Sequence, residues 1–106
     1  MLPDHAVREI IISRPRLRRD LRFAFQDYRE TPSYVLEDLT HRRYFQIGLA
    51  EHQFLSELNG VRTAREVLAD NARIFGEDAI SEEQAAVLLR WAIDQQLLET
   101  ESADQS

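Results

Sequence analysis

The sequence predicts an α+β domain in which a three-stranded antiparallel sheet is followed by three helices. Over residues 22–47, apolar residues alternate with polar ones, and this period of two is typical of half-buried strands. From residue 49 onward, apolar residues recur at the spacing of an amphipathic helix. Because the strand period ends before the helical period begins, the pattern favours a sheet packed on a group of helices over an alternating α/β fold.

Three short strands joined by tight turns are expected, over residues 22–28, 34–37 and 43–47. Residues 30–33 supply the turn chemistry of the first connection, and polar residues supply the second. In the last strand, Phe45 and Ile47 share one face, and Tyr44 and Gln46 share the other. This arrangement is typical of an antiparallel meander.

Two helices follow the strands. Residues 49–58 carry an apolar stripe, and Gly60 is expected to end this helix in a left-handed conformation. The second helix opens at Thr63, because its hydroxyl can accept from the backbone N–H of Glu66 while the Glu66 carboxylate reaches back to the N–H of Thr63. The expected buried stripe of the second helix consists of Ala64, Val67, Leu68, Ala72 and Phe75.

The third helix is expected over residues 81–96, with a second capping box at Ser81 and Gln84. Apolar residues cover more than one face of this helix, which is more than one small sheet needs. Trp91, the single tryptophan, therefore either belongs to the core or lines a groove. Surplus apolar surface beside an open strand edge is what a peptide-binding groove requires.

The two ends of the chain fall outside this pattern, so the domain is expected to span residues 14–98. Residues 1–13 are interpreted as an N-terminal arm, loose or forming an extra first strand through Ile10, Ile11 and Ile12. Such a strand would block the groove. Leu97 and Leu98 are expected to dock on the core. Residues 99–106 are polar and acidic, and are expected to be a disordered tail.

Composition narrows the classes of function. The chain has 106 residues, no cysteine and a net charge of −6, and no apolar run approaches the ~18 residues of a membrane span. Residues 1–47 hold 9 Arg and 7 acidic residues, and residues 48–106 hold 4 Arg and 12 acidic residues. An acidic domain is a poor match for nucleic acid, which demands a basic face. The expected location is the cytoplasm or the cytoplasmic face of a membrane protein.

No catalytic arrangement is found in the sequence. The 3 histidines do not form a helical zinc motif, and the 3 glycines do not form a phosphate-binding loop. The adjacent acids Glu82 and Glu83 suit the first turn of a helix, where the dipole favours negative charge. We therefore expect a chain without catalytic activity, metal or cofactor.

Five arginines between residues 14 and 22 form the sharpest charged feature. One interpretation is contact with an acidic partner or an anionic membrane surface. The other is a solvated strand edge whose charge is balanced by the acidic helices. The arginines concerned are Arg14, Arg16, Arg18, Arg19 and Arg22.

The segments RYFQI and FLSELNGVRTAREV resemble the PqqD-like fold. The matching positions are Ile47, Leu55, Leu58, Asn59, Gly60, Arg62, Thr63, Glu66 and Val67. The resemblance implies a winged-helix-like arrangement of three strands and three helices. Members of this family include the peptide chaperone of pyrroloquinoline quinone synthesis and the RiPP recognition elements. They bind the leader of a precursor peptide as an added strand between the third strand and the third helix.

A second likeness is narrower. The segments RPRLRRDLRF, YRE, YVLED and RYFQI are similar to the part that precedes the membrane region in bacterial peptide zinc metalloproteases of the site-2 type. Gly48 and Leu49 stand where that subfamily often has Ser and Pro. Because no zinc motif is present, protease activity would lie outside these residues. The likeness implies a domain of a larger protein for peptide maturation or export.

The resemblance leads to a hypothesis of peptide binding without catalysis, with a precursor or leader peptide, or a neighbouring membrane or secretion protein, as partner. Arg43 and Arg90 would pair acidic residues of the ligand. Two alternatives stay open: a structural docking or dimerisation domain, and a winged-helix DNA-binding domain, which the acidic charge disfavours. The expected peptide-binding residues are Arg43, Tyr44, Phe45, Gln46, Ile47, Val87, Arg90, Trp91 and Asp94.

Overall fold

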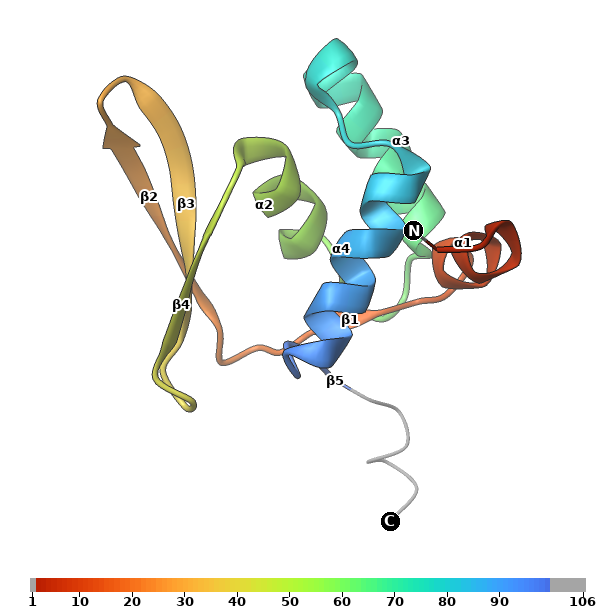
Figure 1. Ribbon diagram of the computed structural model, residues 1–106, viewed down its shortest axis with the longest axis horizontal. Helices are drawn as coiled ribbons and strands as arrows, with labels where there is room; N and C mark the ends of the chain where they lie inside the picture. The colour runs from red at the N-terminus through yellow and green to blue at the C-terminus, as the bar shows by residue number, and fades with distance from the viewer. Residues whose placement is uncertain (1, 100–106) are drawn as a thin grey trace.

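The computed structural model describes residues 2–99. Its α+β class and its three-stranded antiparallel sheet are confirmed, and Figure 1 shows the sheet on one side of the molecule and helices on the other. The elements in chain order are α1 (Asp4–Ile11), β1 (Arg16–Leu17), β2 (Arg22–Tyr28), β3 (Thr31–Asp38), β4 (Arg43–Ile47), α2 (Leu49–Ser56), α3 (Ala64–Phe75), the short 3-10 helix η1 (Gly76–Asp78), α4 (Glu82–Asp94) and β5 (Leu98–Glu99).

The sheet has the strand order β2-β3-β4, and both pairings are antiparallel. The register sets Phe23 opposite Leu36 and Leu36 opposite Phe45, so these side chains share the face that packs on the core. The alternation expected for β4 is confirmed, since Ile47 is buried whereas Tyr44 is exposed. Among residues 2–99, β4 pairs with β3 alone, so its other edge is open within this part of the chain.

The first turn is tighter than the sequence suggested. The sequence predicts a turn at residues 30–33. In the structure the turn residues are Arg29 and Glu30, whose φ angles are 54° and 62°. Two successive left-handed residues make a type I′ hairpin turn, whose twist matches that of the paired strands. Strand β3 consequently begins at Thr31 instead of residue 34 and includes Pro32.

The predicted helix ends are confirmed where a capping side chain or a left-handed glycine defines them. Both capping boxes are present, at Thr63 with Glu66 and at Ser81 with Gln84. Gly60 has a φ of 80°, the left-handed value expected after the first predicted helix. Helix α2 begins after Gly48 without a side-chain cap, and it ends two residues earlier than expected, at Ser56.

The extra first strand expected at the N-terminus is wrong. Residues 4–11 form helix α1, which lies against α3 and α4, and Ile11 is completely buried in the core. The chain then runs through β1, which pairs with β5 and so joins the N-terminal segment to the residues that follow α4. The sequence did not indicate this two-stranded sheet, which holds Leu98 and Glu99.

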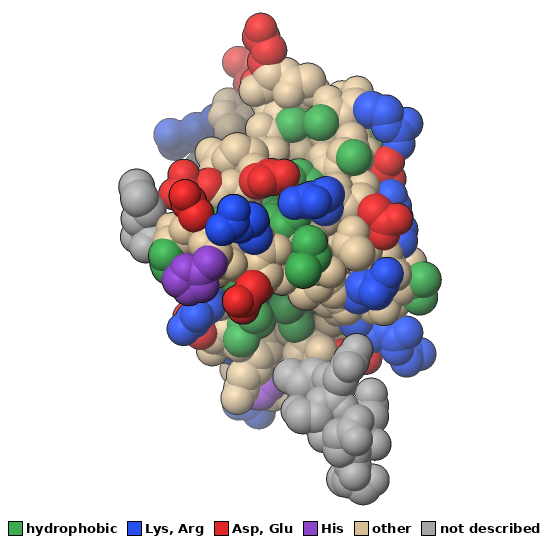
Figure 2. Space-filling model, turned by 90° about the vertical axis from the view of Figure 1, so that its right-hand side faces the viewer, with side chains coloured by type: hydrophobic (Ala, Val, Ile, Leu, Met, Phe, Trp, Pro, Cys, Tyr) green, Lys and Arg blue, Asp and Glu red, His purple; other side chains and the backbone are tan. Residues whose placement is uncertain are grey.

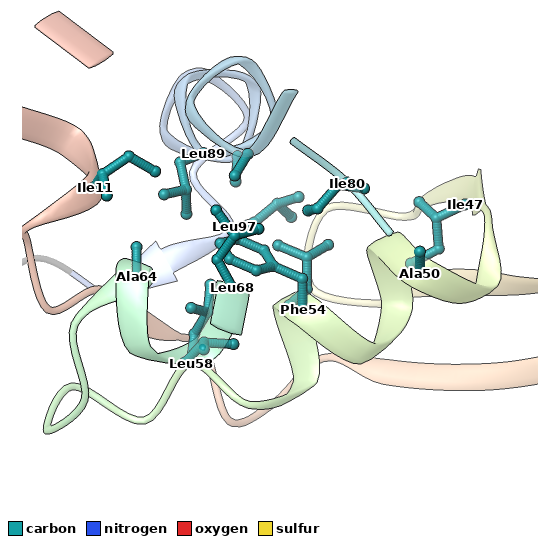
Figure 3. Close-up of a cluster of buried hydrophobic side chains, with 14 of the residues drawn as sticks. Ile11, Ile47, Ala50, Phe54, Leu58, Ala64, Leu68, Ile80, Leu89 and Leu97 are labelled. Atoms are coloured by element: carbon teal, nitrogen blue, oxygen red, sulfur yellow. The ribbon is translucent and has the colours of Figure 1, made fainter. Parts of the chain in front are cut away.

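One core sits between the helices and the inner face of the sheet (Figure 3). Phe54, Leu55 and Leu97 are fully buried there, and the docking of Leu97 is confirmed. On α3, Ala64, Val67 and Leu68 are buried as expected, but the next buried position is Asn71, whereas Ala72 is exposed. The Asn71 side chain donates to the Ala50 carbonyl at 2.8 Å and accepts from the Ile80 N–H at 3.1 Å, so it joins α2 to the start of α4.

Glu99, which the sequence assigned to the acidic tail, belongs to β5. The rest of that expected tail, residues 100–106, lies outside the described residues. Among residues 2–99, no helix combines the length and the apolarity that crossing a bilayer requires.

Candidate functional site

A groove runs between the open edge of β4 and helix α4. It contains two hollows, of about 540 Å³ and about 520 Å³, which share Glu51, Leu88 and Trp91. The first also touches residues 44–48, and the second extends along α4 over Ile80 and Val87. We call this surface the β4–α4 groove, and its lining residues are Tyr44, Phe45, Gln46, Ile47, Gly48, Glu51, Ile80, Glu83, Gln84, Val87, Leu88 and Trp91.

The floor of the β4–α4 groove is apolar. The rings of Phe45 and Trp91 meet edge to face with centroids 5.0 Å apart, so the sheet and α4 are in contact through aromatic side chains. Both rings are partly buried against the core, and each keeps a surface toward the groove. Beside them Val87 is 49% exposed and adds apolar surface to the groove.

The wall of the groove formed by β4 offers backbone groups. In an antiparallel pair, alternate residues of a strand bond to the neighbour, and the residues between them point their N–H and C=O groups the other way. Strand β4 has no second neighbour among the described residues, so these groups face the groove. An extended segment of another chain fits such an edge as an added strand.

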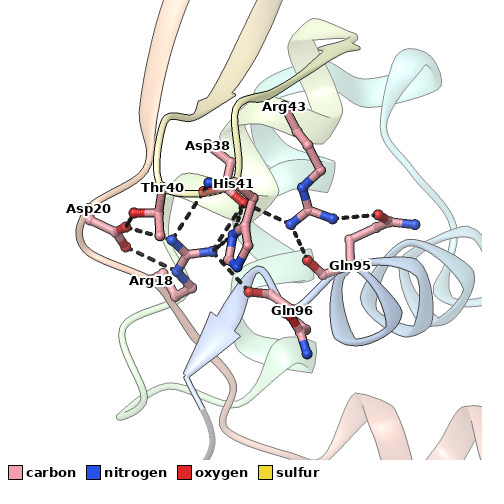
Figure 4. A network of polar contacts seen from close by, with 8 residues as sticks. All are labelled: Arg18, Asp20, Asp38, Thr40, His41, Arg43, Gln95 and Gln96. Atoms are coloured by element: carbon pink, nitrogen blue, oxygen red, sulfur yellow. Dashed lines mark hydrogen bonds and ion pairs between the residues drawn. The ribbon is translucent and has the colours of Figure 1, made fainter.

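Arg43 closes one end of the groove. It begins β4, and its guanidinium donates to the backbone carbonyl of Gln95 at 2.6 Å and to the Gln95 side-chain Oε1 at 2.9 Å (Figure 4). Because Gln95 is the C-cap residue of α4, this side chain fastens the start of the strand to the end of the helix. The helix carbonyls there attract a cation.

Arg43 also belongs to a polar cluster around Asp38, which is completely buried at the end of β3. The Asp38 carboxylate accepts from Arg43 at 2.7 Å and from Arg18 at 3.1 Å, and Nδ1 of His41 lies 2.8 Å away. Burial alone would raise the pKa of Asp38. Its hydrogen bonds outweigh burial and hold that pKa well below its ordinary value.

The Asp38 cluster spans three distant parts of the chain. Arg18 lies between β1 and β2, and its guanidinium also contacts Asp20 and donates to the Gln96 carbonyl at 3.1 Å. The sheet, the N-terminal segment and the end of α4 are therefore held together at one point, as Figure 4 shows. Asp38 and Asp20 balance the charges of Arg18 and Arg43 within this cluster.

Other members of the arginine cluster of the sequence also serve the fold. Nε of Arg14 donates to the Val61 carbonyl at 2.9 Å, and Nε of Arg16 donates to the Asn59 carbonyl at 3.1 Å. These contacts fix the N-terminal segment on the loop between α2 and α3. They favour the interpretation of this arginine cluster that involves no acidic partner or membrane surface.

Six of the nine expected site residues line the groove, and three do not. Arg43 sits at its end, held by the Asp38 cluster. Arg90 and Asp94 form an exposed ion pair with Nε and Oδ1 3.5 Å apart, and Arg90 lines a separate hollow between α1 and α4. The six are Tyr44, Phe45, Gln46, Ile47, Val87 and Trp91.

The sequence did not indicate several groove residues. Leu88 and Gln84 lie three and seven positions before Trp91 and so share its face of the helix, a spacing that could have indicated them. Glu51 offered no such signal, because it comes from α2 and reaches the groove only through the packing of α2 on α3 and β3. In the described part of the chain, no cluster of three or more potential ligands is placed to hold a metal ion.

Comparison of the chain with models of protein families, with curated proteins and with solved structures finds no match.

Proposed function

We propose that this chain is a non-catalytic peptide-binding module, in which an extended peptide adds as a strand to the open edge of β4 and rests its side chains on α4. We also propose that its strands and helices have the winged-helix-like arrangement of PqqD-like domains. Its partner would be a precursor or leader peptide, or a segment of a neighbouring protein of the membrane or of secretion. The domain would serve a larger protein for peptide maturation or export.

One observation carries the proposal: an unpaired strand edge and an apolar groove lie side by side. The free N–H and C=O groups of β4 supply affinity that does not depend on sequence, and the pockets around Trp91 supply selectivity for side chains. Either feature alone is common. Together they match the two requirements of strand addition.

The N-terminal segment leaves this groove free, contrary to the expected blocking strand. Helix α1 lies on the other flank of α4, where Ile10 and Arg90 line the hollow between the two helices. Strand β1 pairs with β5 and not with β4. Within residues 2–99, no segment therefore pairs with the open edge of β4.

A DNA-binding role has less support. Helix α4 would be the recognition helix, and it carries Glu82, Glu83 and Asp94 against Arg90 alone. On the flank seen in Figure 2, acidic, basic and hydrophobic side chains are interspersed, and no basic patch dominates. A docking or dimerisation domain would use the same open edge, with a second copy of the chain in the place of the peptide.

The test is selection of displayed random peptides of about ten residues, long enough to exceed a typical strand. Val87→Gln removes apolar surface from the groove and adds no charge. Ile93→Gln is the matched control, because Ile93 is on the same helix and is 51% exposed, close to the 49% of Val87, but lines the hollow beside α1. We expect peptides that bind the wild type to bind Val87→Gln roughly five- to tenfold more weakly.

Binding to Ile93→Gln should equal binding to the wild type, and circular dichroism should show that both variants keep their melting temperature within a few degrees. If no peptide distinguishes the wild type from Val87→Gln, the groove is not a peptide site. Dimerisation of the wild type in analytical ultracentrifugation, lost in Val87→Gln, would then identify the docking alternative.

A further inference from the structure

We propose that the occupant of the β4–α4 groove is a basic peptide, one in which Lys or Arg accompanies apolar residues. This inference rests on the proposed function and specifies its ligand. The observation behind it is the charge of the lining: among the described residues that line the two hollows, the charged ones are Glu51 and Glu83, and both are acidic.

Both carboxylates are free to take a cation. Neither forms an ion pair or a side-chain hydrogen bond with another described residue. Acidic residues at the start of the two neighbouring helices are engaged instead. The Glu66 side chain caps α3, and on α4 Oε2 of Glu82 lies 3.9 Å from Nε of Arg65. Glu51 lies where the two hollows join, with its carboxylate close to Gly48, and Glu83 lies further along α4.

The two arginines that were expected to pair with a ligand, Arg43 and Arg90, already form ion pairs within the domain. Arg43, at the closed end, is paired with the buried Asp38 carboxylate and bonded to Gln95. Arg90 is paired with Asp94 and lies on the flank of α4 that faces α1. Among the residues that line the two hollows, an acidic peptide would therefore meet two carboxylates and no cation, which reverses the ligand charge expected from the sequence.

The apolar floor sets the second requirement. Side chains of an added strand point alternately to its two sides, so every second residue can rest on Phe45, Leu88 and Trp91. Residues that approach Glu51 or Glu83 gain an ion pair if they are Lys or Arg. The favoured ligand thus combines aliphatic residues at alternate positions with basic residues beside them.

The test uses the same displayed peptides and reads their charge. Among clones that bind the wild type in a groove-dependent way, we expect Lys and Arg to exceed Asp and Glu by about threefold relative to the unselected library, the size of one exposed ion pair. Glu83→Arg should abolish this excess. Raising the salt concentration should reduce it, since exposed charges are screened.

Glu82→Arg is the matched control, because Glu82 precedes Glu83 in the first turn of α4, carries the same charge near the helix dipole and does not line the groove. It should leave the excess unchanged. Groove-dependent clones without a basic excess, or with an excess that Glu83→Arg does not reduce, would overturn the basic-ligand proposal and leave peptide binding intact. A wild type that enriches no groove-dependent clone would overturn both.

Discussion

Asp38 is the centre of the polar cluster that joins the sheet to the N-terminal segment and to the end of α4. Its carboxylate is fully buried, and it accepts hydrogen bonds from Arg18 of the N-terminal segment, from Arg43 of β4 and from His41 of the turn between β3 and β4. A buried charge is tolerated only when it is paired and hydrogen-bonded. Asp38 therefore fixes the sheet against the helices and holds Arg43 at the end of the groove.

This position predicts a specific dependence on pH. Because the pKa of Asp38 is lowered in the folded state, its ionised form stabilises the fold above the ordinary aspartate pKa of about 3.9. That contribution is lost as the pH falls from there toward the folded pKa. Asp38→Asn should lower the free energy of unfolding by about 3 kcal/mol at neutral pH, since two partly buried arginines lose their partner.

Urea unfolding at pH 7 and at pH 3 checks this expectation. The wild type should lose more stability between the two values than Asp38→Asn does, because the variant has no carboxyl group there to protonate. An equal loss in both proteins would show that Asp38 does not control the response to acid.

At this scale the sequence allowed only part of the site to be predicted. Tyr44 and Phe45 could be assigned to opposite faces of a strand because alternation is local. The role of Arg43 could not, because its partners Asp38 and Gln95 meet it only after the chain folds. Asn71 was missed for the same reason, since an asparagine on an apolar stripe reads as exposed until its two backbone partners are known.

At the scale of elements, those with strong local signals could be predicted from sequence. Strands β2 and β4 have a clear period of two, and the capping boxes of α3 and α4 need only residues three positions apart. Strands β1 and β5 have two residues each, too few for any period to show.

Helix α1 was missed because a run of three isoleucines imitates a strand. The relevant spacing is that of Val7, Ile10 and Ile11, which lie three and four positions apart and all pack on the core. Ile12 follows the helix and is 58% exposed. β-branched residues favour strands by intrinsic propensity, but tertiary packing overrides that preference here and this segment is helical.

This helix predicts a contrast between neighbouring residues. Ile11→Ala should lower the free energy of unfolding by about 3 kcal/mol, because it leaves a cavity where a fully buried side chain touched the core. Ile12→Ala should change it by less than about 0.5 kcal/mol. Thermal or urea unfolding of the two variants measures both values. Similar losses would show that α1 does not pack as described.

At the scale of the whole molecule, the groove is a product of topology. Strand β4 and helix α4 are separated in the sequence by α2 and α3, and they meet only because the sheet folds back on the helices (Figure 1). The sequence of neither β4 nor α4 indicates that these two elements will be neighbours. The resemblance to PqqD-like domains predicts peptide binding between these two elements, and this stays a prediction.

Charge is also a property of the whole molecule. Most of the negative charge lies in residues 48–106, which include the helical side of the groove, while the arginines near β4 are paired within the Asp38 cluster. At the groove itself, this negative charge is represented by Glu51 of α2 and Glu83 of α4. The sequence favoured an acidic ligand because Arg43 and Arg90 were expected to be free, and both are paired in the structure.

Amide hydrogen exchange in β4, followed by NMR with and without a selected groove-dependent peptide, tests strand addition most directly. Strand addition predicts that the β4 amides that point away from β3 exchange at least about tenfold more slowly when the peptide is bound, because they gain backbone partners. Amides already bonded to β3 should change less. Binding that perturbs Trp91 while the outward amides of β4 keep their exchange rates, or protection that appears along β2 instead, would contradict strand addition at β4.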